Sequence, residues 1–196
     1  ISYHHSNDQW YKEELLRINT RSRIFNDYSV DTGDISDSLS TEAIRTKIRD
    51  EYLQDSTVTI LLVGTGTWGR KHIDWEIFSS MFDGTVNKKS GILVINLPST
   101  GCTTCTAPHQ GEKEIIHPEI YDWTSIRERS EYERRYQSMP DRIIDNLLKE
   151  EALVSVVSWD KIVNNPDKLR FLIDLAHKDR ISCVYDLSRP MRMRDA

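Results

Sequence analysis

Residues 57–63 are the stretch that most constrains the fold of this chain. They are β-branched or leucine in a nearly unbroken apolar run, which the Gly-Thr-Gly turn at residues 64–66 closes. A second apolar run, residues 91–97, is stopped by Pro98. Strands that are apolar at almost every position are covered on both faces, as in parallel sheets packed between helices. The sequence therefore predicts an α/β protein.

Strands and helices alternate along the chain. The predicted strands are residues 1–4, 24–30, 57–63, 91–97 and 153–159, and the predicted helices are residues 8–18, 41–54, 71–81, 140–151 and 166–178. This alternation predicts a flavodoxin-like, doubly wound, five-stranded parallel sheet. A chain of 196 residues fits one such domain.

The predicted domain has two irregular parts. Residues 98–139 form a long elaborated loop region after the fourth strand, and a loop of this length is usually functional or an insertion. Its aromatic residues Tyr121, Trp123 and Tyr136 predict that it packs back onto the body. The C-terminal residues 181–196 carry arginines interleaved with Asp and Ser, which is typical of a solvated tail.

Composition excludes several classes of protein. The net charge of −5 gives no basic footprint for nucleic acid, and no apolar run approaches the ~20 residues of a membrane helix. Three cysteines without a secretory signal favour a reducing, cytoplasmic setting. Because Ile1 opens the sequence within a predicted strand, we expect a few residues to precede it.

Glu76 is the candidate catalytic residue. A helix turns about 100° per residue, so the apolar side chains of residues 71–81 share one arc and Glu76 lies outside it. Its neighbours one turn away, His72, Ser79 and Ser80, are polar and leave room for a ligand. The helix follows the carboxyl end of a buried strand, where open α/β sheets bind ligands. The alternative is an ordinary solvated glutamate.

Polar residues after the first and third predicted strands are candidate substrate-binding groups. In the flavodoxin-like strand order, both loops flank the crevice at the switch point. His5, Ser6 and Asp8 have polar side chains that suit ribose, phosphate or adenine contacts, although Ser6 or Asp8 can instead cap the following helix. Thr65, in the Gly-Thr-Gly turn, belongs either to a phosphate cradle or only to a tight strand exit.

Other charged and metal-ligating residues receive a structural interpretation. Asp74 falls inside the apolar arc, and its first-turn position predicts an interaction with the helix dipole. Cys102 and Cys105, with His109 and His117, lack the paired spacing of a structural zinc site. We therefore expect free thiols and no metal.

Several separated segments resemble the bacterial TIR-like family, whose members are distant relatives of Toll/interleukin-1 receptor domains and include the TIR subunits of Thoeris anti-phage defence systems. The resemblance is close over residues 1–97 and weaker at residues 122–123, 140–142 and 185–186. The segments that carry it are residues 1–8 (ISYHHSND), 29–31 (SVD), 34–37 (DISD), 48–52 (IRDEY), 56–60 (STVTI) and 70–77 (RKHIDWEI).

The resemblance implies a TIR fold and an NAD+ glycohydrolase or ADP-ribosyl cyclase-type activity, with NAD+ as substrate and no other cofactor. Glu76 matches the essential glutamate of TIR enzymes, whereas His72 stands where the family has a tryptophan. Trp75, next in the chain to Glu76, can supply the missing aromatic packing. Asp34 falls in the BB loop, which gates the nucleotide pocket and contacts other subunits; an acidic loop can also be merely solvated.

The resemblance also implies partners. These are self-association through TIR surfaces, an effector that senses the signal, and a phage-derived trigger. We expect a cyclic or conjugated ADP-ribose product, because residues 98–139 are bulky enough to cover the crevice and restrict water. The competing interpretation is a non-enzymatic TIR-like interaction module. A receiver-like or flavodoxin-like phosphate or flavin binder is disfavoured, since no acidic cluster ends the first strand.

Overall fold

A parallel sheet forms the centre of the fold. In the computed structural model, which describes residues 1–27, 39–85 and 87–196, three strands pair in the order β1–β2–β3. Val58 lies opposite Gly91, and Leu93 lies opposite Ser155. The strands are β1 (Val58–Val63), β2 (Gly91–Asn96) and β3 (Ser155–Ser158). Each falls within a predicted strand, so the α/β class and the parallel sheet are confirmed.

The first predicted strand is reduced to a single bridge beside β1. The backbone N–H of Ser2 donates to the carbonyl of Ile60 at 2.8 Å, and Leu62 donates to Ser2 at 2.9 Å. This neighbour on the outer side of β1 agrees with the flavodoxin-like order. Residues 24–27 of the second predicted strand have no regular secondary structure, and residues 28–30 lie outside the described part. The five-stranded sheet therefore stays a prediction.

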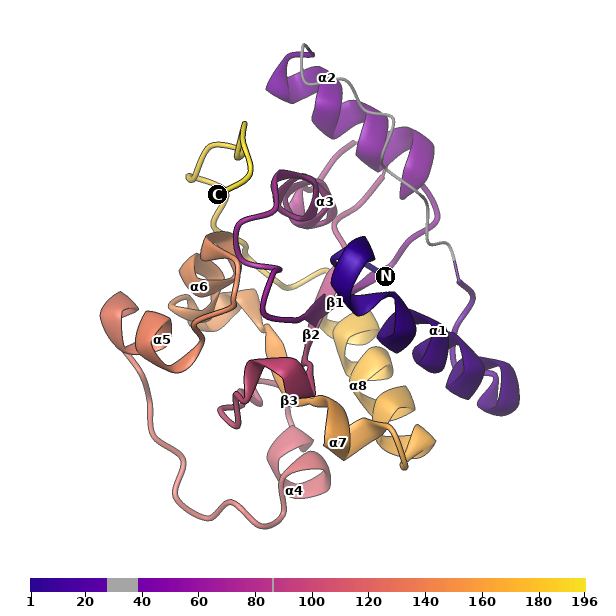
Figure 1. Ribbon diagram of the computed structural model, residues 1–196, viewed down its shortest axis with the longest axis vertical. Helices are drawn as coiled ribbons and strands as arrows, with labels where there is room; N and C mark the ends of the chain where they lie inside the picture. The colour runs from indigo at the N-terminus through magenta and orange to yellow at the C-terminus, as the bar shows by residue number, and fades with distance from the viewer. Residues whose placement is uncertain (28–38, 86) are drawn as a thin grey trace.

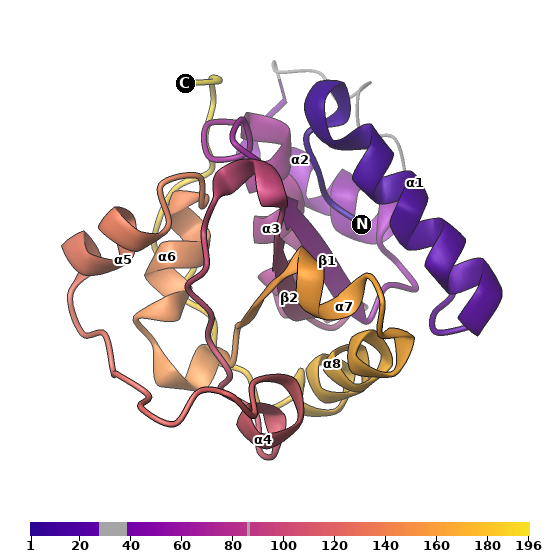
Figure 2. The same ribbon diagram turned by 60° about the horizontal axis from the view of Figure 1, so that its bottom comes forward.

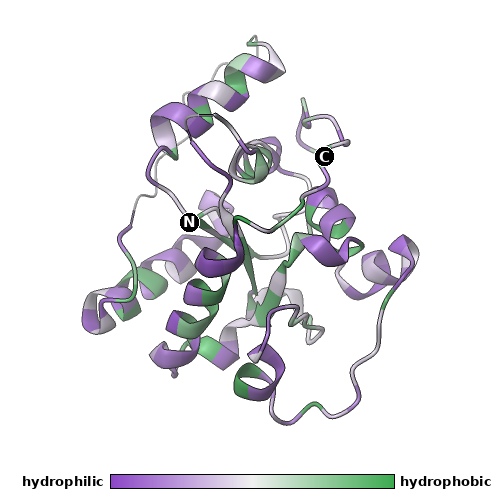
Figure 3. Ribbon diagram, turned by 180° about the vertical axis from the view of Figure 1, so that it is seen from behind, coloured by the Kyte–Doolittle hydropathy of each residue, from purple (hydrophilic) through white to green (hydrophobic). Residues whose placement is uncertain are grey.

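Helices cover both faces of the sheet (Figures 1 and 2). Along β1, Ile60 and Leu62 pack toward the helices at residues 5–22 and 166–179, whereas Leu61 and Val63 pack toward those at residues 71–81 and 141–147. Figure 3 shows apolar residues gathered in the central strands. The helices are α1 (His5–Ser22), α2 (Thr41–Thr46), the π-helix η1 (Lys47–Tyr52), α3 (Lys71–Met81), the 3-10 helix η2 (Pro98–Thr100), α4 (Glu112–Ile116), α5 (Arg129–Arg135), α6 (Asp141–Leu147), the 3-10 helix η3 (Glu150–Ala152), α7 (Trp159–Ile162) and α8 (Pro166–Asp179).

The predicted helix over residues 41–54 changes its winding part way. It begins as α2, with the Ser40 side chain accepting from the N–H of Ala43, and widens into η1. Ile44 and Ile48 pack against Trp75 on the outer side of α3. This helix therefore supports α3 from the side that faces away from the sheet (Figure 1).

The segment 98–139 packs along the outer edge of β3. The backbone of Thr106 pairs with Val156 in an antiparallel bridge, with N···O distances of 3.1 and 3.2 Å. Tyr136 is buried and Trp123 is half-buried, as predicted, but Tyr121 is 89% exposed, so the prediction for that residue was wrong. The loop between α4 and α5, which contains Tyr121, runs over the surface (Figure 2).

The C-terminal segment is not a solvated tail. Met191 is buried in the cluster that contains Trp75, and Arg189 pairs with Asp145 at 2.5 Å. Arg192 pairs with Asp141 at 3.1 Å. Asp141 and Asp145 lie one turn apart on α6 and present a single acidic face to these arginines. The interleaved arginines looked solvated in sequence because their partners lie more than forty residues away.

Glu112 gives the fold a pH dependence that can be measured. Burial raises the pKa of this carboxyl to about 7 from the ordinary 4.5, and its Oε2 accepts from the N–H of His109 at 3.1 Å. Between these two pH values the folded state holds a proton that the unfolded state loses, so the contribution of Glu112 to stability is fully present below pH 4.5 and is lost as the pH rises through about 7. The shift corresponds to a loss of up to about 3 kcal/mol. Urea unfolding of the wild type and of Glu112→Gln should diverge over this range.

The Glu112→Gln comparison isolates the carboxyl from other titrating groups. Glutamine keeps the acceptor for His109 but cannot ionise, so the variant should be the more stable protein at pH 8. An identical pH dependence in the two proteins would contradict the prediction.

Candidate functional site

Glu76 lines a cavity of about 440 Å³. Its side chain projects from the middle of α3 and is half-buried. The other walls come from residues 24–27, from the turn and strand at residues 52–60, and from α8. A carboxylate in an open cavity of this size is the arrangement expected of a small-molecule site.

The cavity lies toward the amino-terminal ends of the strands, contrary to the carboxyl-edge position that we predicted. The helix α3 begins after the end of β1 and runs back along it, so Ser80 reaches Thr59 near the start of β1, with 2.7 Å between their hydroxyl oxygens. Glu76 lies five residues beyond Lys71, about 7.5 Å back along the sheet at the helical rise. Because α3 runs back along β1, the Glu76 carboxylate lies away from the carboxyl ends of the strands.

The walls offer groups for both a sugar and an aromatic ring. Hydroxyl groups come from Ser2, Ser56, Thr57 and Ser80, and aromatic faces come from Phe25 and Tyr52. Ribose binding uses hydroxyl partners of this kind, and flat bases bind against aromatic side chains. The cavity can hold a nucleoside-sized ligand beside Glu76.

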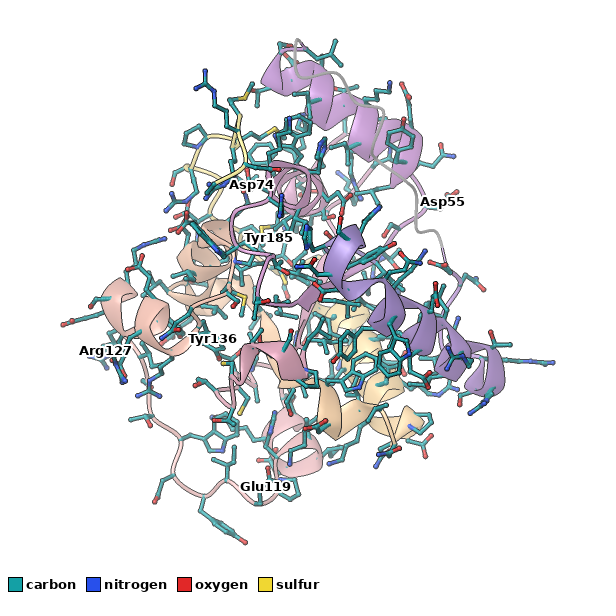
Figure 4. All side chains as sticks on the ribbon, in the orientation of Figure 1. Asp55, Asp74, Glu119, Arg127, Tyr136 and Tyr185 are labelled. Carbon is teal, nitrogen blue, oxygen red and sulfur yellow. The ribbon has the colours of Figure 1, made fainter. Side chains whose placement is uncertain are left out.

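A buried ion pair between Asp74 and Arg142 anchors α3, the helix that carries Glu76. Arg142, fully buried on α6, donates to both carboxylate oxygens of Asp74 at 2.8 and 3.0 Å. The N–H of Arg192 also donates to Asp74, at 2.8 Å, and Trp75 Nε1 donates to the carbonyl of Arg192 at 2.7 Å. Asp74 is labelled beside α3 in Figure 4. Asp74 does lie in the first turn of α3, as predicted, but its main partner is Arg142, which was not predicted from the sequence.

A second polar cluster forms where the first loop meets the Gly-Thr-Gly turn. A Cβ atom at Gly64 would lie 2.4 Å from Asp8 Oδ1, so only glycine allows this approach. Asp8 is buried, its Oδ2 has no hydrogen-bond partner among the described residues, and burial raises its pKa. Asp8 does not cap α1, since the N-cap position belongs to His4. The two loops contact each other here, outside the walls of the Glu76 cavity.

The other predicted binding residues also lie outside the walls of the Glu76 cavity. His5, Ser6 and Thr65 are exposed, and the His5 ring stacks on Tyr3 with centroids 4.4 Å apart. The rings of His72 and Trp75 pack edge to face, with their centroids 4.9 Å apart. These assignments stay predictions.

The BB-loop candidate Asp34 falls outside the described residues, as do Asp31 and Asp37 on either side of it in the sequence. Asp27, the last described residue before this gap, is exposed and lines the cavity. Trp75, which we expected to provide aromatic packing near Glu76, is fully buried and packs with His72, so it offers no surface to a ligand.

Sequence reasoning missed three charged residues that the structure connects to this site. Asp55 and Asp174 line the cavity, and Arg142 anchors α3. From sequence alone, an aspartate in a turn or on the polar face of a helix looks the same as any solvated residue. Arg142 could have been identified as a buried charge, because it directly precedes the apolar pair Ile143 and Ile144 in a helix that packs on the sheet.

The three cysteines of the chain are free thiols. Cys102 donates its thiol hydrogen to the carbonyl of Arg135 at 3.3 Å. Among the described residues, no group of three or more His, Cys, Asp or Glu side chains is placed to hold a metal ion. A broader hollow of about 1120 Å³ lies between residues 103–108, residues 120–127 and α6.

Comparison with known proteins gives one match. The sequence model of the family described as "Thoeris protein ThsB, TIR-like domain" matches residues 1–101, which include β1, α3 and Glu76. No curated protein and no solved structure matches the chain. Within the described residues, no helix has the length and apolar character needed to cross a membrane.

Proposed function

The chain belongs to the TIR-like domain family of the Thoeris protein ThsB, and we propose that it cleaves the nicotinamide–ribose bond of NAD+ with Glu76 as the catalytic carboxylate. A Thoeris TIR-like domain indicates a role in anti-phage defence. The proposed product is a cyclic or conjugated ADP-ribose that signals to a separate effector. The observation that carries the proposal is the half-buried carboxylate of Glu76 in an open cavity.

The chemistry requires one well-placed carboxylate. Nicotinamide is a good leaving group because the pyridinium ring takes the electron pair of the breaking C–N bond. The difficulty lies in the positive charge that develops on the ribose ring, which a nearby carboxylate stabilises. In the proposed complex, Glu76 accepts a hydrogen bond from a ribose hydroxyl, and Ser80 lies one turn along α3 on the same wall.

The state of the cavity favours an enzyme over a pure interaction module. An adaptor domain has no need of an open, acid-lined cavity, and its crevice would be filled by side chains.

The identity of the product has less support than the cleavage step. No residue of the segment 98–139 lines this cavity, so our expectation that the segment covers it is not met. The proposal of a cyclic or conjugated product thus rests on the family.

The proposal is tested with purified protein and NAD+. Chromatography with mass detection should show nicotinamide released in equal amount to an ADP-ribose product, with a cyclic product one water lighter than ADP-ribose. The assay is repeated in extracts of phage-infected cells, which supply any trigger. Absence of nicotinamide release in both settings would favour the interaction module.

Activity per subunit should rise with protein concentration. Asp27, Asp55 and Asp174 are exposed residues in the walls of an open cavity, so a second subunit has a surface beside Glu76 on which to complete the site. We expect the turnover per subunit to increase several-fold between dilute protein and protein that light scattering shows to be associated. Full activity from a monomer, with a flat concentration dependence, would contradict this.

A further inference from the structure

The walls of the Glu76 cavity carry an excess of negative charge. Asp27, Asp55 and Asp174 line it together with Glu76, and all three aspartates are exposed. Figure 4 shows Asp55 at the outer margin of the molecule. No lysine or arginine is among the described residues that form the walls. A cleft lined by one sign of charge concentrates ligands of the opposite sign and repels ligands of the same sign.

One observation inside the cavity points to a ligand. Ser2 lines the cavity; it is 3% exposed, and its Oγ has no hydrogen-bond partner among the described residues. A buried hydroxyl normally has a partner, which a bound ligand would supply.

We propose that this cavity is selective for a flat organic cation of the pyridinium type, and that Asp55 and Asp174 determine the selectivity. The inference rests on the proposed function and refines it. The cationic nicotinamide ring of NAD+ enters the acidic cavity, and the anionic diphosphate stays outside. Phe25 and Tyr52 provide aromatic faces to which a cation is attracted. The unpartnered hydroxyl of Ser2 suits the carboxamide of the ring.

The same charges favour the departure of the product. When the C–N bond breaks, its electron pair passes to the ring nitrogen and nicotinamide becomes neutral. The aspartates then no longer hold the ring, while the positive charge develops on the ribosyl group beside Glu76. The walls therefore bind the ring in its charged form and release it in its neutral form.

The test uses two small probes that differ in charge. 1-Methylnicotinamide is a permanent cation and nicotinamide is neutral, and neither carries a ribosyl bond to cleave. Both are titrated into the full chain at low salt and followed by NMR. We expect the cation to bind at least about tenfold more tightly, and the preference to shrink at about 0.5 M NaCl because the rim charges are exposed.

Variants identify the residues responsible. Asp55→Asn combined with Asp174→Asn should weaken binding of the cation about tenfold and leave nicotinamide within about twofold. Asp160→Asn, which removes an exposed aspartate outside the cavity, is the matched control and should change neither. Equal affinity for the two probes, no binding of either, or an equal loss of both in the double variant would overturn the proposal.

The result of this binding test can be distinguished from the result of the NAD+ cleavage test of the proposed function. An enzyme that releases nicotinamide but shows no preference for the cation refutes only this inference. A protein that prefers the cation but never cleaves NAD+ refutes only the proposed activity.

Discussion

Glu76→Gln should lower the rate of nicotinamide release from NAD+ by at least about 10²-fold, the scale seen when one charge-stabilising group is removed from an active site. Glutamine has nearly the same shape and still accepts a hydrogen bond from a ribose hydroxyl. It lacks the negative charge that stabilises the developing cation. The rate is measured by chromatography of released nicotinamide, under conditions in which the wild type turns over.

Controls separate a chemical effect from a folding effect. Glu76 is half-buried in an open cavity, so the free energy of unfolding should change by less than about 1 kcal/mol. Glu114→Gln, at an exposed glutamate on α4, makes the same change away from the cavity and should leave the rate unaltered. A folded Glu76→Gln protein with the wild-type rate would remove Glu76 from the proposed mechanism.

The sequence predicted those parts of the fold that depend on local patterns. The apolar runs of β1 and β2 identified a sheet covered on both faces, and the start of α8 was predicted at Pro166. The structure places the Asn165 side chain on the N–H of Lys168, at 3.2 Å, which caps that helix. Such features are read from neighbouring residues and need no knowledge of the tertiary contacts.

The candidate site could be predicted only in part, because its geometry depends on contacts between distant residues. The helical wheel placed Glu76 outside the apolar arc, which agrees with its place in the cavity wall. The periodicity does not say which end of the sheet the side chain faces; the direction of α3 decides that. Asp174 lines the cavity from a helix almost one hundred residues later in the chain, and no local sequence pattern predicts that position.

The ion pair between Asp74 and Arg142 stabilises the fold, and it too is a contact between distant residues that the sequence alone does not predict. The two residues are 68 positions apart, and each alone looks like an ordinary helix charge. Together they join α3, within the family-matched half, to α6, beyond it. Arg142 also donates to the carbonyls of Arg189 and Pro190, at 2.9 and 3.1 Å, so the C-terminal segment is held at the same point.

Arg142→Met should destabilise the protein by about 3–5 kcal/mol, because it leaves the Asp74 carboxylate buried without its partner. For a domain of this size, that loss lowers the melting temperature by roughly 10 °C. Urea unfolding measures the free energy, and hydrogen exchange should show faster exchange of the α3 amides than of those in α8. Arg134→Met, which removes an exposed ion pair with Glu131, is the control and should leave the urea midpoint close to that of the wild type, because solvent screens such a pair.

A second variant distinguishes the lost charge balance from simple lost packing. Adding Asp74→Asn to Arg142→Met removes the unpaired charge and keeps an acceptor for the N–H of Arg192. The double variant should therefore recover a substantial part of the stability, since replacing both members of a buried pair is far less costly than removing one. If the double variant is as unstable as Arg142→Met, packing of the arginine rather than its charge holds α3. If Arg142→Met unfolds at the wild-type urea concentration, the pair does not anchor the helix that carries Glu76.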